Sequence, residues 1–266
     1  MLLSKTLNYS ETSLTNCIIL THAYIRPHEE HKIAPIEFAV KHYRHNNPND
    51  YLMLLGHGIR PNVDCDYMYW EDPVNEKDIN VGHPRLCNMA YDHAAQKGFK
   101  KVLKTRSDSI HLIRNLCKFA DDKLQNKKIL VTQQTRIDKP QVGDLFMYGD
   151  LDFLKLCWNI DKWYPTNTGV TSLANNLQSV VRESSWRDCC INHLRLIDIY
   201  NLKWICLQKN WKNVIDNMPK VLENDMPDWH ESLWGSRQKW HVWSKDGELI
   251  YSKPKVGKIT TEKDWI

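Results

Sequence analysis

A short polar segment directly after an apolar run holds the residues best suited to chemistry. The segment reads Lys104-Thr105-Arg106-Ser107-Asp108-Ser109 and follows the run Val102-Leu103. A carboxylate at a strand end can bind a divalent cation, and such a cation neutralises a diphosphate while a bond to it breaks. Arg106 can pair with a phosphate through two parallel hydrogen bonds and take over part of that role. A solvated salt bridge at a strand end remains the alternative interpretation of the same residues.

Polar residues also follow two other predicted strands. Thr21, His22 and Tyr24 come at or after the end of the first apolar run, and Glu71 and Asp72 follow the third. In open parallel sheets, ligands bind beyond the carboxyl ends of the strands. We therefore expect these residues near one ligand, although strand-end polar residues also cap helices and pair with their neighbours.

The elements that must position these residues alternate between strand and helix at short spacing. Apolar, β-branched runs predict strands at 16–21, 51–56, 63–70, 101–105, 128–133 and 202–208. Helical spacing of apolar residues predicts helices at 33–46, 84–97, 110–124, 150–158 and 180–199, with Pro84 in a first turn. This alternation predicts an α/β fold with a Rossmann-type, mainly parallel sheet flanked by helices.

Composition narrows the class of protein. The 266 residues are 42% hydrophobic and 26% charged with a net charge of +4, which favours a folded core and gives nucleic-acid binding little support. The sequence has no eighteen-residue apolar run and no signal-peptide-like start, so we expect a cytoplasmic protein without a membrane span. The eight cysteines form no CxxC pair and read as reduced, mostly buried thiols.

Tryptophan is unusually abundant toward the end of the chain. The sequence holds 11 tryptophans, among them Trp229, Trp234, Trp240 and Trp243 in the last part. Soluble proteins rarely expose so much aromatic surface, so we expect this Trp-rich region to pack on the sheet and border the acceptor cleft. A C-terminal core filled by large aromatics is the alternative. Alternating residues around Asp246-Gly247 predict a β-hairpin over 240–251.

One known family shares the central pattern of this sequence. The stretch HPRLCNMAYDHAAQKGFKKVLKTRSDSI, followed by GDLFMYG, resembles the WavE-like glycosyltransferases over roughly residues 16–160. In that family an arginine-bearing helix precedes a strand ending in Lys-x-Arg-x-Asp, and an Asp-x-phe-phe-x-Gly-like element follows. The matching positions here are Arg85, Lys104, Arg106, Asp108, Asp144, Phe146 and Gly149. The first strand differs, because it leads into THAYIRP instead of a Gln-Gly-like turn.

The resemblance implies a GT-A-like glycosyltransferase of bacterial or viral origin. Such an enzyme moves a sugar from a nucleotide-sugar donor to a growing surface glycan or glycoprotein oligosaccharide. It implies one domain over 1–266, with a nucleotide-sugar half at 16–110 and an acceptor half at 111–266. Asp108 would bind a divalent metal, Mn2+ or Mg2+. The implied donor-binding residues are Thr21, His22, Tyr24, Glu71, Asp72, Arg85, Lys104, Arg106 and Asp108.

An inverting enzyme of this kind needs a carboxylate base to deprotonate the acceptor hydroxyl. Asp144 is the first candidate because an aromatic run follows it, and Glu183 or Asp188 are alternatives. Asp144 can equally be a turn residue after Gly143, and a retaining enzyme needs no such base. Two other classes of protein stay open, a non-catalytic carbohydrate-binding protein and another nucleotide-using α/β enzyme, such as a phosphatase or nucleotidyltransferase.

Overall fold

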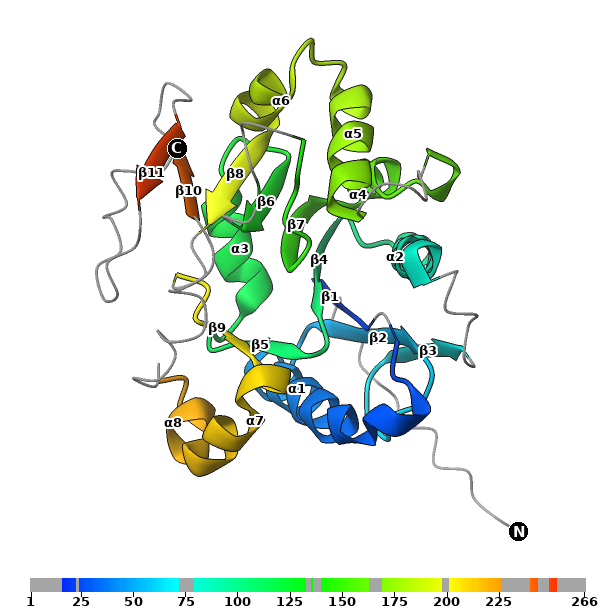
Figure 1. Cartoon of the computed structure of the whole chain (residues 1–266), viewed down its shortest axis with the longest axis vertical. Coiled ribbons are helices and arrows are strands. Elements are labelled where there is room, and N and C mark those ends of the chain that lie inside the picture. Colours follow the sequence, from blue (N-terminus) through cyan, green and yellow to red (C-terminus); the bar gives the residue numbers. More distant parts are fainter. Residues whose placement is uncertain are drawn as a thin grey trace.

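A seven-stranded sheet runs through the centre of the computed structural model (Figure 1). The structure describes residues 16–22, 24–71, 79–132, 135, 140–162, 169–197, 201–225, 240–243 and 249–252. The strands of the sheet, in spatial order, are β3 (Tyr67–Glu71), β2 (Tyr51–His57), β1 (Cys17–Thr21), β4 (Lys101–Arg106), β7 (Phe146–Asp150), β6 (Ile129–Thr132) and β8 (Leu194–Ile197). Only β7 runs antiparallel to its neighbours in this sheet. The predicted α/β architecture with a mainly parallel, Rossmann-type sheet is confirmed.

The central strands are apolar because both of their faces are covered. All five residues of β1 and all seven of β2 are buried, as expected for parallel strands with helices on both sides. Successive residues point to opposite faces, so Ile19 joins one core and Ile18 the other.

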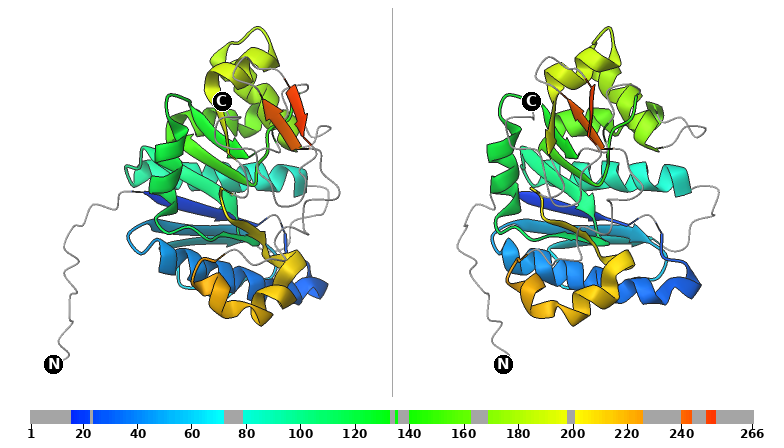
Figure 2. Two further views of the ribbon diagram at one scale, coloured as in Figure 1. Left: turned by 90° about the vertical axis from the view of Figure 1, so that its left-hand side faces the viewer. Right: turned by 60° about the vertical axis from the view of Figure 1, so that its left-hand side comes forward.

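Two layers of helices enclose the sheet (Figure 2). One face packs against α2 (Ile79–Gln96), α4 (Leu151–Cys157), α5 (Gly169–Val181) and α6 (Trp186–His193). The other face packs against α1 (Ile33–Asn46), α3 (Leu116–Leu124), α7 (Leu207–Asp216) and α8 (Met218–Leu222). The same face carries a ribbon of β5 (Ser109–His111) and β9 (Trp204–Cys206). Two 3-10 helices, η1 (Pro27–Lys32) and η3 (Ile160–Lys162), complete the described elements of these layers.

Several predicted boundaries of helices are wrong. The helix expected over 110–124 begins only at Leu116, because Ser109–His111 pairs with β9 instead. The helix expected over 180–199 is divided, since Arg182 adopts a left-handed backbone with φ 58° after α5. Its last part forms β8, which pairs with β6. Helix α2 starts at Ile79, which places Pro84 inside it and not in the first turn.

The C-terminal hairpin is confirmed as a pair of strands. β10 (Trp240–Trp243) and β11 (Leu249–Ser252) pair antiparallel, with Trp240 opposite Ser252. The turn residues Asp246 and Gly247, together with Trp229 and Trp234, lie outside the described residues. The packing of the Trp-rich region on the sheet therefore stays a prediction. Within the described part of the chain, no helix is both long enough and apolar enough to cross a bilayer.

Gly58 links the ends of β2 and β3 to Ile25 and should be the most sensitive glycine among the described residues. It has φ 87°, and a Cβ there would lie 2.0 Å from the carbonyl oxygen of Ile25. Its N–H donates to the carbonyl of Glu71 at 3.0 Å. We expect Gly58→Ala to lower the free energy of unfolding by about 2 kcal/mol or more.

Gly98→Ala provides a matched control for this substitution. Gly98 has a similar φ of 84°, but a Cβ there would meet nothing within 4 Å. Its replacement should cost only the backbone strain, about 1 kcal/mol. Urea unfolding curves of both variants measure the difference, and equal losses would contradict the close approach at Gly58.

Candidate functional site

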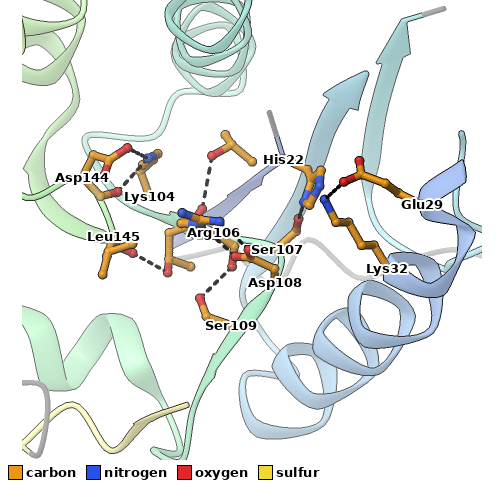
Figure 3. A network of polar contacts seen from close by, with 12 residues as sticks. His22, Glu29, Lys32, Lys104, Arg106, Ser107, Asp108, Ser109, Asp144 and Leu145 are labelled. Atoms are coloured by element: carbon orange, nitrogen blue, oxygen red, sulfur yellow. Dashed lines mark hydrogen bonds and ion pairs between the residues drawn. The ribbon is translucent and has the colours of Figure 1, made fainter. Parts of the chain in front are cut away.

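The site lies where the carboxyl ends of β1 and β4 meet. These strands are parallel neighbours, with Thr21 opposite Arg106. The antiparallel strand β7 starts at the same edge, because Phe146 pairs with Thr105. Asp144, two residues before β7, is therefore brought to this edge from a distant part of the sequence (Figure 3).

Arg106 and Asp108 form a two-pronged ion pair at the end of β4. Nε of Arg106 donates to Oδ1 of Asp108 at 2.8 Å, and Nη2 donates to Oδ2. The Asp108 side chain is 2% exposed, whereas the Arg106 side chain is 43% exposed. Burial raises the pKa of Asp108, but the guanidinium outweighs it and holds this pKa below its usual value. The aspartate thus anchors an arginine that still faces solvent.

Backbone hydrogen bonds fix the loop that carries this pair. The N–H of Ser107 donates to the carbonyl of Thr21 at 3.0 Å, which ties the loop to β1. The N–H of Leu207, at the start of α7, donates to the carbonyl of Asp108 at 2.9 Å. The Ser109 hydroxyl donates to the carbonyl of Arg106 at 3.1 Å. The loop is consequently held from both sides by elements remote in the sequence.

His22 sits beside this loop and is neutral at physiological pH. Its Nδ1 lies 3.1 Å from Oγ of Ser107, and the residue is 6% exposed. Burial lowers its pKa to about 4; Asp108 opposes this shift, whereas Arg106 and Lys32 add to it. Lys32 pairs with Glu29 on η1, next to His22 in Figure 3. The edge therefore carries two cations, Arg106 and Lys32, on either side of a neutral imidazole.

Lys104 faces Asp144. It is fully buried, and its Nζ donates to the carbonyl oxygen of Asp144 at 2.7 Å and lies 3.7 Å from Oδ2. Burial raises the pKa of Asp144, but Lys104, His83 and Arg106 lower it below its usual value. Asp144 is therefore an ionised carboxylate, and its side chain is 30% exposed. The ammonium group of Lys104 is enclosed with Asp144, and the donor contact expected for Lys104 stays a prediction.

A second cluster lies at the carboxyl ends of β2 and β3. Glu71 forms an ion pair with Arg85, and its Oε2 lies 3.1 Å from Nδ1 of His57. The Tyr69 hydroxyl donates to Oε1 of Glu71 at 2.5 Å. Burial lowers the pKa of His57 against the opposing effect of Glu71. Two expected donor-binding residues, Glu71 and Arg85, thus meet at this edge.

The remaining expected residues are placed as follows. Thr21 is buried, and its hydroxyl donates a hydrogen bond to the carbonyl oxygen of Thr105 at 3.4 Å. Tyr24 is partly buried next to Gly58. Asp72 lies outside the described residues.

The structure does not bring Glu183 or Asp188 to this edge. Glu183 Oε1 lies 2.8 Å from Nε2 of His193, which directly precedes β8. Because β8 runs parallel to β6, its first residue lies at the opposite, amino edge of the sheet. Asp188 accepts a hydrogen bond from Ser185 at the start of α6. These two carboxylates support local structure, and Asp144 is the one carboxylate among the three candidates at the site.

The described residues do not fit a metal bound by Asp108 in this arrangement. Both carboxylate oxygens of Asp108 already accept hydrogen bonds from Arg106. No group of three or more histidine, cysteine, aspartate or glutamate residues in the described ranges is arranged to hold a metal ion. The positive charge at the edge comes from side chains.

Four residues of this edge did not stand out in the sequence as part of the site. Lys32 and Glu29 lie in a polar stretch that resembles an ordinary helix start. His83 and Trp158 are separated in the sequence by the rest of α2, by β4, β5, α3, β6 and β7, and by α4. The ring centroids of His83 and Trp158 are 5.5 Å apart. The histidine in Gly56-His57-Gly58 did offer a signal, since it ends a buried strand.

Comparisons with known proteins find distantly similar solved structures. No family model matches the chain, and no curated protein matches it. One similar solved structure is a glycosyltransferase involved in glycosylation of the major capsid of PBCV-1, with 14% identity and a TM-score of 0.47 over 80% of this chain and 92% of that chain. Another is a candidate nucleotide-diphospho-sugar transferase from Desulfovibrio desulfuricans G20, with 10% identity and a TM-score of 0.44 over 80% of this chain and all of that one. At these levels, neither similarity assigns an activity to this chain.

Proposed function

We propose that this protein is a GT-A-like glycosyltransferase of the WavE-like kind. It would move a sugar from a nucleotide-sugar donor to a growing surface glycan or glycoprotein oligosaccharide. The supporting observation is the solvent-facing Arg106, which buried Asp108 anchors at the junction of two parallel strands. We further propose a single domain over 1–266, with the donor half at 16–110 and the acceptor half, including the Trp-rich region, at 111–266.

The donor diphosphate would lie over the carboxyl ends of β1 and β4. There the exposed part of the Arg106 guanidinium can donate hydrogen bonds to phosphate oxygens, while Asp108 keeps the group in one orientation. Lys32, which is paired with Glu29, lies across His22 and can offer a further donor to a phosphate. Tyr24, Glu71 and Arg85 would line the side toward the nucleoside. This arrangement places positive charge where the leaving diphosphate develops negative charge.

A divalent metal is not required by this arrangement. Asp108 becomes available to Mn2+ or Mg2+ only when Arg106 releases it, for example to the donor phosphates. Donor binding with and without EDTA separates the two cases. Binding that survives chelation assigns the charge neutralisation to Arg106, and binding that requires manganese assigns it to a metal on Asp108.

Asp144 would serve as the base that accepts the proton of the acceptor hydroxyl. Its side chain is partly exposed and ionised, as this role requires. It lies at the same sheet edge as Arg106, so the acceptor would approach from the side of β7. Replacement by asparagine should abolish transfer while donor binding persists.

A thermal-shift screen tests the proposed function. The purified protein is heated with UDP-, GDP- and CMP-sugars, each with manganese or with EDTA. A ligand that binds the folded state at 100 times its dissociation constant stabilises it by about 2.7 kcal/mol, so one nucleotide class should raise the Tm clearly. Stabilisation by free oligosaccharides alone would instead indicate a carbohydrate-binding protein. Equal stabilisation by all nucleotides, with release of phosphate, would indicate another nucleotide-using enzyme.

A further inference from the structure

Lys104 is an unusual lysine for this part of the chain. Among the lysines and arginines that the structure describes, it is the one that is fully buried. Buried ammonium groups are costly unless they are paired and hydrogen-bonded. The sequence places this lysine inside β4 between Leu103 and Thr105, where an apolar residue would pack without any such cost.

The contacts of Lys104 converge on Asp144. Its Nζ donates to the Asp144 carbonyl oxygen at 2.7 Å and lies 3.7 Å from the carboxylate Oδ2. The same Nζ lies 5.0 Å from the ring centroid of Trp158, which is 2% exposed at the end of α4. One ammonium group thus holds both the backbone and the side chain of Asp144, and an aromatic wall excludes water behind it.

We propose that Lys104 is a positioning residue that fixes Asp144 at the site and keeps its carboxylate ionised. The proposal rests on the proposed function only for the role of Asp144 as a base. The hydrogen bond to the carbonyl sets the position of the loop before β7, and the charge stabilises the carboxylate. The donor contact implied by the sequence resemblance is thereby replaced by a contact on the acceptor side of the site.

Other titratable groups around Asp144 add less positive charge. Arg106, at the end of β4, also lowers the pKa of Asp144, but it is engaged with Asp108. His83 on α2 also faces the Asp144 carboxylate. Burial lowers the pKa of His83 to about 3, so this histidine is neutral at pH 7. Cys87 on α2 is a neutral thiol, since burial raises its pKa to about 12. The charge on Lys104 is therefore the main support of the ionised carboxylate.

Carboxyl carbon NMR measures the proposed effect without any assay of activity. Aspartate side chains are labelled with 13C, and the Asp144 signal is identified by its absence in Asp144→Asn. In Lys104→Met, burial acts on Asp144 with less opposing charge, so its pKa should rise by about one unit or more. Lys104→Gln provides a second variant, because an amide can still donate to a nearby carbonyl but carries no charge.

Lys101→Met is the matched control. Lys101 lies on the same strand and also pairs with an aspartate, Asp121, but it is exposed and distant from Asp144 in the register. The titration of Asp144 should be unchanged in this variant. An unchanged titration of Asp144 in a folded Lys104→Met or Lys104→Gln protein would overturn the proposal.

The pH dependence of transfer links the inference to function. The acid limb of the kcat/KM profile should move to higher pH in Lys104→Gln by the same interval as the pKa of Asp144, with recovery at pH 8. The KM for the donor should stay unchanged. A uniform loss at all pH values would overturn the charge effect and reduce Lys104 to a packing residue. If the wild type transfers no sugar while the NMR shift is observed, the proposed function fails and the pairing stands.

Discussion

Replacing Arg106 with alanine should reduce transfer by on the order of 100-fold or more and should also destabilise the fold. The loss of activity follows because the variant lacks the cation that faces the leaving diphosphate. The loss of stability follows because Asp108, which is 2% exposed, keeps its charge without a partner. A buried carboxylate that loses its counter-charge should cost about 2–4 kcal/mol.

Asp108→Asn should be milder for stability and comparable for activity. The guanidinium left behind is 43% exposed and can regain water, so we expect a loss of about 1–2 kcal/mol. If Asp108 were an ordinary surface residue, Asp108→Asn would lower the free energy of unfolding by less than about 1 kcal/mol. Its burial and its two-pronged pairing change that expectation. The order of the two variants, with Arg106→Ala the less stable, is the specific prediction.

Arg44→Ala is the matched control for both variants. Arg44 also forms an ion pair with an aspartate, at 2.6 Å from Asp66, and its side chain is 32% exposed. Asp66 precedes β3, which places the pair at the opposite edge of the sheet. Urea unfolding and initial transfer rates should show little change in this variant. Similar losses of activity in Arg44→Ala and Arg106→Ala would contradict a specific role for Arg106.

Mild acid should unfold this protein, because several histidines are buried in the neutral state, among them His22, His42 and His111. Burial lowers the pKa of His22 and of His42 to about 4 and that of His111 to about 3, against a usual value of 6.5. The unfolded chain therefore binds protons below pH 6.5 that the folded chain does not. Stability is complete above pH 6.5 and falls as the pH drops toward 4. By pH 5 each histidine should remove about 2 kcal/mol.

Free energies of unfolding measured in urea between pH 8 and pH 4.5 test this expectation. The three losses together are a large part of the roughly 5–15 kcal/mol that stabilises a typical domain. His42→Gln should flatten the pH dependence, because glutamine does not titrate, whereas the exposed His45 makes His45→Gln a matched control without effect. A stability that stays constant from pH 7 to pH 5 would contradict neutral burial of these histidines.

The local sequence is sufficient to predict the parallel half of the sheet. Runs such as Cys17–Thr21 and Tyr51–His57 are apolar throughout because both of their faces are covered, and that burial is visible as continuous hydrophobicity. The helix between them, Ile33–Asn46, was predicted at its exact bounds because its apolar residues keep one face. The end of the next parallel strand, β4, then locates Arg106 and Asp108 at the carboxyl edge.

The second half depends on contacts that no local pattern contains. Ser109–His111 is a strand because Trp204–Cys206 lies beside it, almost a hundred residues further along the chain. Helix α7 was missed because the polar and Trp-rich composition after residue 209 hides its apolar stripe, including Leu207 and Val214. The pairing of Lys104 with Asp144 likewise requires the antiparallel register of β4 and β7, which only the folded chain defines.

The central claim is that Arg106 binds the donor diphosphate, and calorimetric titration tests it most directly. The nucleotide-sugar chosen by thermal shift is titrated into wild type, Arg106→Ala and Arg44→Ala in the presence of EDTA, after each variant is shown to be folded. The account predicts that the wild type and Arg44→Ala bind with equal Kd, while Arg106→Ala binds at least about tenfold more weakly. Equal affinity of folded Arg106→Ala and wild type would contradict it.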